Sequence, residues 1–219
     1  MYGLKDNVAR KAGTMGKEEN KEMEFWTQEE FQAFLECVAD KPISYYAFEM
    51  LYWTGIREGE LLALTPADFN FEKKTLRINK SYQRLEGKDA ITDPKTPKSN
   101  RTIVMSDFLA VEMENFISSL YGIRDDDRIF TISKSYLHHE MDRGAKLAGV
   151  KKIRIYGLRH SHISLLINLG FSALAIGERV GYEAVDITYH YAHLFPTVQT
   201  DMAAQLETER EALVNVRKE

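Results

Sequence analysis

Two arginine motifs have the residue types and spacing that phosphate binding requires. Arg57 follows the helix-breaking Gly55 and precedes Glu60 by three residues, so the two charged side chains would lie on one face of a helix. Arg159 comes near the start of another apolar helix, where free backbone N–H groups favour an anion. A guanidinium can bind two phosphate oxygens at once. An ordinary surface ion pair between Arg57 and Glu60 nevertheless explains the first motif, taken alone, somewhat better.

Side chains that can move protons or act as nucleophiles lie in three further segments. Lys95 stands in a basic turn before a predicted strand, where it could protonate a leaving group or simply face solvent. His160 and His162 follow the second arginine, and such histidines more often have a structural role than bind a ligand. Tyr189 and Tyr191 lie on a short predicted helix, where a tyrosine more often packs than reacts. Each segment is ambiguous by itself.

The charge of the chain is unevenly distributed. The net charge of −4 argues at first against a nucleic acid partner. Residues 73–101, however, hold nine basic and three acidic side chains, and residues 143–159 hold six basic and no acidic ones. Two such segments could form a phosphate-binding face on an otherwise acidic protein. Solvated loops and strands are an equally good explanation.

The composition excludes several classes of protein. The single cysteine, Cys37, rules out an intramolecular disulfide and is compatible with a reducing cytosol. No cysteines and histidines stand at zinc-site spacing, so we expect no structural metal. No apolar run approaches the roughly 20 residues that a membrane-spanning helix needs. We therefore expect a cytoplasmic protein without a membrane partner.

The periodicity predicts a mostly α-helical domain with one small sheet. Thr27 and Glu30 form a capping box, and Gly55 should end the second helix. Apolar residues at helical spacing predict helices over 27–35, 42–54, 58–64, 108–120, 135–147, 158–169, 172–180, 186–191 and 198–216. Alternation over 75–80 and 101–105, with a shorter run over 90–92, predicts strands. The expected class is α+β with a three-stranded antiparallel sheet.

Four segments agree with one family in order and internal spacing. They are TGIREGELLAL (54–64), KTPKSNRTI (95–103), YGLRHSHISLL (156–166) and GYEAVDITYHYAHL (181–194). Together they resemble the motifs of the tyrosine recombinases, specifically the integrases of bacterial phages and conjugative elements. The resemblance covers residues 25 to about 195 and implies a catalytic domain over 23–195. Residues 1–22 would be a linker or the end of a preceding core-binding domain.

The resemblance implies a role for each motif. Arg57 and Arg159 would contact the nonbridging oxygens of the scissile phosphate, and Glu60 would orient the first of them. Lys95 would be the general acid for the departing 5′-oxygen. Tyr191 would be the nucleophile that forms a 3′-phosphotyrosine. No cofactor and no metal is expected.

Tyrosine occurs at three positions that need separate comment. Tyr191 is preferred to Tyr189 as the nucleophile because it lies nine residues after Tyr182 and precedes Ala-His, as in the family. The family usually has histidine at the position of Tyr156, and histidine or tryptophan at that of Tyr182. Histidine exchanges protons near neutral pH, whereas phenols as a class ionise near pH 10. Either His160 or His162 could supply the missing function, and the sequence does not choose between them.

The implied function is site-specific DNA recombination that integrates or excises a mobile element. The implied partners are double-stranded DNA at attachment sites, further copies of the chain in a tetrameric synapse, and accessory DNA-bending proteins. A C-terminal amphipathic helix over 196–219 would either dock on a neighbouring protomer or fold onto its own domain. Two alternatives stay open. One is a type IB topoisomerase-like enzyme, and the other is a DNA-binding module without catalysis, which Tyr156 and Tyr182 favour.

Overall fold

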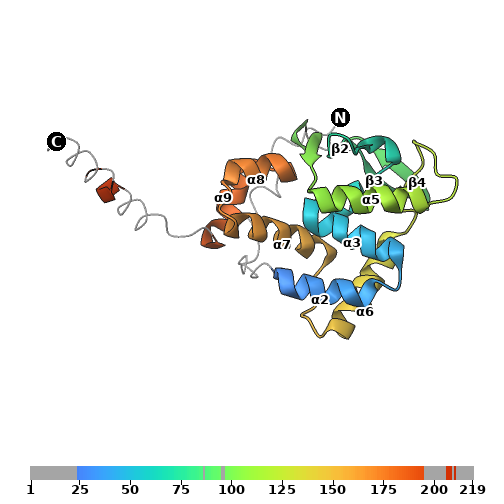
Figure 1. The fold of residues 1–219 in the computed structure, drawn as a ribbon, viewed down its shortest axis with the longest axis horizontal. Helices are drawn as coiled ribbons and strands as arrows, with labels where there is room; N and C mark the ends of the chain where they lie inside the picture. Colours follow the sequence, from blue (N-terminus) through green and yellow to red (C-terminus); the bar gives the residue numbers. More distant parts are fainter. Residues whose placement is uncertain (1–23, 86, 95–96, 195–205, 209, 211–219) are drawn as a thin grey trace, which may run out of the picture.

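The computed structural model describes residues 24–85, 87–94, 97–194, 206–208 and 210. It is a mostly helical protein with short strands at one side (Figure 1). The α-helices are α2 (Gln28–Val38), α3 (Pro42–Thr54), α4 (Glu58–Leu61), α5 (Asp107–Ser119), α6 (Lys134–Ala148), α7 (Ile155–Asn168), α8 (Ala173–Val180) and α9 (Ala184–Tyr191). The predicted class, mainly α-helical with a small antiparallel sheet, is confirmed.

Local sequence signals fix the ends of the first two helices. The Glu30 backbone N–H donates to the Thr27 hydroxyl at 3.2 Å, and the Thr27 N–H donates to the Glu30 carboxylate at 2.9 Å, which completes the predicted capping box. Pro42 opens α3, and Gly55 ends it with a left-handed φ of 64°. A Cβ at position 55 would lie 2.5 Å from Cδ2 of His162, so this turn brings the end of α3 close against α7.

Five short strands form two antiparallel sheets. The strands are β1 (Phe69–Asn70), β2 (Thr75–Ile78), β3 (Ser81–Leu85), β4 (Lys88–Thr92) and β5 (Arg101–Val104). The main sheet has the order β1-β2-β5, and β3 pairs with β4 in a separate hairpin. The three predicted strands are all present, but the one near 90–92 lies in the hairpin and not in the main sheet. The third strand of that sheet is β1, which is too short to show an alternating pattern.

Buried apolar side chains form two clusters that meet at α7. The larger cluster joins α2, α3, α5 and α6 to the main sheet. The smaller one consists of Ile163, Ile167, Ile176, Val180, Ile187 and Tyr191. Figure 1 shows the corresponding arrangement, with α8 and α9 at one end of the molecule and α7 running from them towards the remaining helices. Residues from both halves can therefore converge around the first turns of α7.

Two of the predicted segments lie outside the described residues. These are residues 1–22 and most of the C-terminal segment 196–219, of which only 206–208 and 210 are described. The linker, the C-terminal amphipathic helix and the domain boundaries at 22 and 195 remain predictions. Within the described part of the chain, no helix is long and apolar enough to cross a membrane.

Candidate active site

The first arginine motif forms a tight local unit with its carboxylate. Arg57 is the N-cap of α4. Its backbone N–H donates to Glu60 Oε2 at 2.8 Å, and its Nη1 donates to Glu60 Oε1 at 2.9 Å. The Glu60 carboxylate thus binds both the backbone N–H of Arg57 at the start of α4 and the guanidinium of the same residue. The predicted orienting role of Glu60 has a direct geometric basis here, although the role itself stays a prediction.

Arg101, which sequence reasoning missed, completes this unit. It lies at the first buried position of β5, and its Nη1 and Nη2 donate to the two oxygens of Glu60 at 3.0 and 2.9 Å. It also donates to the carbonyls of Ser99 and Arg179 at 3.1 and 2.9 Å. Burial alone would raise the pKa of Glu60, but the hydrogen bonds and charges of Arg101 and Arg57 lower it overall. In the sequence, the signal that could have revealed Arg101 was a basic residue at a strand position that alternation places on the buried face.

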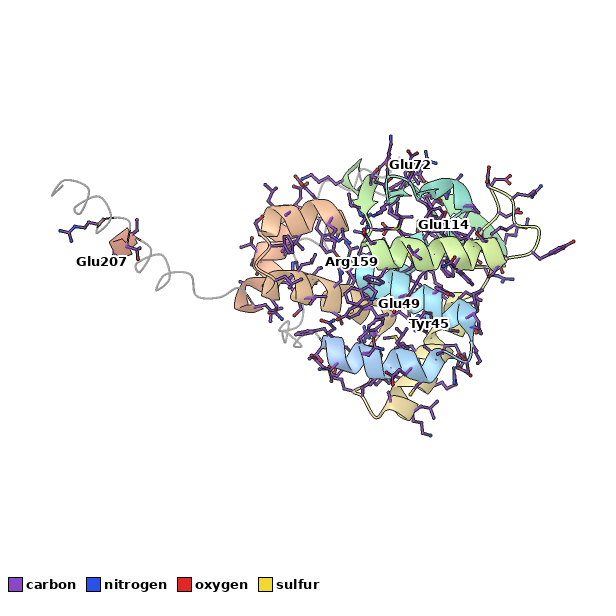
Figure 2. All side chains as sticks on the ribbon, in the orientation of Figure 1. Tyr45, Glu49, Glu72, Glu114, Arg159 and Glu207 are labelled. Atoms are coloured by element: carbon purple, nitrogen blue, oxygen red, sulfur yellow. The ribbon has the colours of Figure 1, made fainter. Side chains whose placement is uncertain are left out.

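Arg159 lies in the interior, near the point where α3 and α7 meet (Figure 2). Only 1% of its surface is exposed. Nη1 donates to the carbonyl of Gly55 at 2.6 Å, and Nη2 donates to the carbonyl of Val180. These carbonyls lie at the C-terminal ends of α3 and α8, where the helix dipoles favour a cation. Burial and then the charge of Arg57 lower its pKa to about 10, so Arg159 stays charged at neutral pH.

The ring of Tyr182 brings the two predicted phosphate-binding arginines together. The ring centroid lies 4.4 Å from Cζ of Arg159 and 5.4 Å from Cζ of Arg57, within the range of cation–π attraction. The Tyr182 hydroxyl is hydrogen-bonded to that of Tyr156, whose side chain is partly exposed. Four predicted site residues from three separate motifs are therefore neighbours in space.

Tyr191 and Tyr189 have opposite environments although they share α9. Tyr191 is 2% exposed, and its hydroxyl is hydrogen-bonded to Nδ1 of His160. Burial, and then the nearby Tyr156, raise its pKa above the ordinary value, while Arg159 opposes the rise. Tyr189 is 84% exposed. Of the two candidate nucleophiles, Tyr191 is thus the one beside the predicted site.

The two histidines after the second arginine also differ. His162 is fully buried behind Gly55 and accepts a hydrogen bond from Nε of Arg179 at 3.0 Å through Nε2. His160 contacts Tyr191, and its ring centroid lies 4.9 Å from that of Tyr156. Burial lowers the pKa of His160 to about 4 and that of His162 to about 3. Both imidazoles are therefore neutral at neutral pH.

A cleft of about 1120 Å³ opens beside this cluster. Arg57, Tyr156 and Tyr182 line one side of it, and the β3–β4 hairpin and the start of α6 line the other parts. Lys98 forms an ion pair with Glu183, the N-cap of α9, so the segment before β5 is joined to the tyrosine-bearing helix. Lys95, the predicted general acid, lies outside the described residues, and no position is assigned to it.

The two basic segments contribute unequally to the cleft. Lys80, Arg84 and Lys98 from residues 73–101 line it. Three bases of residues 143–159 do not line it and form ion pairs of 2.7 to 3.3 Å, namely Arg143 with Asp40, Lys151 with Glu30 and Lys152 with Asp142. The bases at the cleft are paired as well, since Lys80 binds Asp68 at 2.6 Å and Lys98 binds Glu183. Arg159 is the base of the second segment that belongs to the cluster. The expected phosphate-binding face therefore depends mainly on the first segment.

Comparisons with known proteins agree with this arrangement. The family model described as "Phage integrase family" matches residues 24–197. The ICEBs1 integrase of Bacillus subtilis (strain 168) is 31% identical over 217 residues, which cover 92% of this chain and 58% of that protein. The integrase of Staphylococcus phage L54a is 30% identical over 179 residues, covering 74% and 51%. The chain thus spans somewhat more than half the length of these relatives.

A solved structure shows the same fold. The Tn1549 transposon integrase in complex with circular intermediate DNA aligns with a TM-score of 0.70 at 20% identity, covering 88% of this chain and 68% of that one. The XerA recombinase aligns with a TM-score of 0.64. The family model matches most of the chain, including all four motifs from which the cluster is built. The chain therefore belongs to the phage integrase family.

Proposed function

We propose that the chain cleaves and rejoins double-stranded DNA as the catalytic part of a site-specific recombinase that integrates or excises a mobile element. Tyr191 is the proposed nucleophile, and the proposed intermediate is a 3′-phosphotyrosine. Family membership and the DNA complex of the Tn1549 relative support DNA as the substrate. Assembly of four copies at a synapse and the help of DNA-bending proteins belong to the same proposal.

The convergence of Arg57 and Arg159 on Tyr182 is the observation that carries this proposal. A phosphodiester under attack gains negative charge on its nonbridging oxygens, and two fixed guanidiniums oppose that charge. Glu60 holds one arginine and two helix C-termini hold the other, so both guanidiniums are positioned before the phosphate arrives. Because Arg159 is 1% exposed and does not line the cleft, Tyr182 must move aside for a phosphate to reach it. By analogy with oxyanion holes, losing one such donor costs about 10²–10³ in rate.

In the proposed reaction, the Tyr191 oxygen attacks the phosphorus and the bond to the 5′-oxygen breaks. The 5′-oxygen leaves as a hydroxyl after taking a proton from the general acid, for which Lys95 remains the candidate. The covalent intermediate keeps the phosphodiester activated until a second 5′-hydroxyl attacks it. Because Tyr191 is almost fully buried and does not line the cleft, we expect the Tyr156–Tyr182 pair to shift when DNA binds.

The test is covalent trapping on nicked DNA. The 219-residue chain is mixed with a pool of nicked duplexes of randomised sequence, and denaturing electrophoresis detects protein–DNA adducts. We expect an adduct with the wild type and with Tyr189→Phe, which removes an exposed hydroxyl from the same helix, but none with Tyr191→Phe. An adduct that persists in Tyr191→Phe would refute the assignment of the nucleophile. A wild type that binds DNA without forming an adduct would indicate a binding module instead.

A further inference from the structure

Tyr191 has one hydrogen-bonding partner that can take a proton. Its hydroxyl is bonded to Nδ1 of His160, which lies on α7 one helical turn after Tyr156. The imidazole contacts the rings of both tyrosines, with centroid distances of 4.9 Å to Tyr156 and 5.7 Å to Tyr191. A general base must be within hydrogen-bonding reach of the proton that it removes, and His160 meets this condition before any substrate arrives.

His160 is neutral before substrate arrives, which leaves a ring nitrogen free to accept a proton, and the negative charge of a bound phosphodiester would raise its lowered pKa towards the pH of the reaction. Burial, followed by the charges of Arg159 on α7 and His190 on α9, lowers its pKa to about 4. The imidazole is therefore neutral at physiological pH, and with its proton on Nε2 it presents Nδ1 as an acceptor to the phenol. Tyr156 from α7 and Tyr191 from α9 are the other titratable groups that face it.

The other residues that could take this role are engaged elsewhere. His162 accepts a hydrogen bond from Arg179 at Nε2 and packs against the turn at Gly55, so one ring nitrogen is already engaged and the contacts of the ring are with other residues than Tyr191. Tyr156 occupies the position where the family usually has histidine, but its hydroxyl is bonded to Tyr182. A phenol is also a poor proton acceptor near neutral pH. The choice between the two histidines, which the sequence left open, is therefore decided by the fold.

We propose that His160 is the general base that accepts the proton of Tyr191 during strand cleavage. This inference rests on the proposed function, with Tyr191 as the nucleophile. As the Tyr191 O–P bond forms, the phenolic O–H bond breaks and its proton passes to Nδ1 of His160. The P–O5′ bond breaks, and the 5′-oxygen takes its proton from the general acid. In the rejoining step both protons return, so His160 then protonates the departing Tyr191 oxygen.

The closing experiment measures single-turnover cleavage by His160→Gln on the DNA that the wild type traps. We expect cleavage to slow by about 10²–10⁴-fold with DNA affinity unchanged, the usual contribution of general acid–base catalysis. The deficit should shrink as pH rises from 7 to 9, because hydroxide replaces the base. Added imidazole should partly restore cleavage by His160→Ala. The matched control, His139→Gln, removes an exposed imidazole of α6 that does not line the cleft and should cleave normally.

A substrate with sulfur in place of the bridging 5′-oxygen separates base from acid. The 5′-thiolate leaves without taking a proton, so a variant that lacks the general acid should cleave this substrate at close to the wild-type rate. His160→Gln should still cleave it slowly, because the proton of Tyr191 must be removed in either case. Wild-type speed in His160→Gln, or a deficit that neither pH nor imidazole changes, would overturn the inference while leaving the proposed function intact. Failure of the wild type to form any adduct would overturn both.

Discussion

Arg101 offers the sharpest test of how the site is held together. The change Arg101→Met keeps much of the side-chain volume and removes the guanidinium. The Arg101 side chain is only 6% exposed, so the lost charge is a buried one. Glu60 then loses two hydrogen bonds of 2.9 and 3.0 Å and keeps only Arg57 as a charged partner. Removing one member of a buried ion pair typically costs about 3–5 kcal/mol, because the other charge is left without compensation. Because Arg57 still compensates part of the charge of Glu60, we expect a loss near the lower end of this range in the free energy of unfolding.

Urea denaturation of the variant set measures this effect. The double variant Arg101→Met/Glu60→Gln should be less destabilised than the sum of the single changes, because the second change removes the uncompensated charge. Arg124→Met is the matched control, since Arg124 pairs with Asp127 in a similar fork-like geometry but is exposed, and little change is expected there. Wild-type stability in Arg101→Met, or additive effects in the double variant, would refute the proposed bridge.

Two further changes test other parts of the structure. Burial, then the charge of Glu112, raises the pKa of Glu49 to about 7, so its ionisation costs stability progressively from about pH 4.5 to pH 7. Glu49→Gln should therefore stabilise the fold at pH 8 by at most about 3 kcal/mol and have little effect at pH 4, and equal urea midpoints for both proteins at pH 8 would contradict this. Gly55→Ala should lower the melting temperature, since a left-handed φ of 64° disfavours alanine and its Cβ would lie 2.5 Å from His162. The added change His162→Ala should recover part of the loss, and no recovery would show that the clash is not its cause.

Much of the fold follows from periodic patterns. The helices α2 to α9 overlap the predicted runs of apolar residues at helical spacing, although α4 ends at Leu61 and not at residue 64. Thr27, Pro42 and Gly55 mark the ends of α2 and α3 as expected. The short strands were harder to predict, because the two-residue β1 is too short to show a pattern and only two residues separate the end of β2 from the start of β3. The two-sheet arrangement depends on pairing between segments, which single-sequence periodicity does not encode.

The candidate site was predictable mainly because four segments together resemble the motifs of one family. Arginine at a helix start suits phosphate, but the Arg57 motif alone favoured an ordinary ion pair, and the resemblance was needed to place Arg57 and Arg159 in one site. The structure brings both to Tyr182. Arg101 could not be found, since its importance comes from reaching across 41 residues of sequence to Glu60. The bond between His160 and Tyr191 likewise depends on how α9 packs on α7, which only the fold reveals.

The closeness of Arg57 and Arg159 has a consequence for the stability of the whole domain. Two like charges close to one aromatic ring repel each other, and this repulsion contributes to the lowered pKa of Arg159. Without an anion the folded state must carry that cost, whereas a bound phosphodiester relieves it. A ligand that binds only the native state stabilises that state in proportion to its affinity. If the proposed function holds, bound DNA should therefore raise the free energy of unfolding of the domain, because part of the stability without DNA is lost to the repulsion between Arg57 and Arg159.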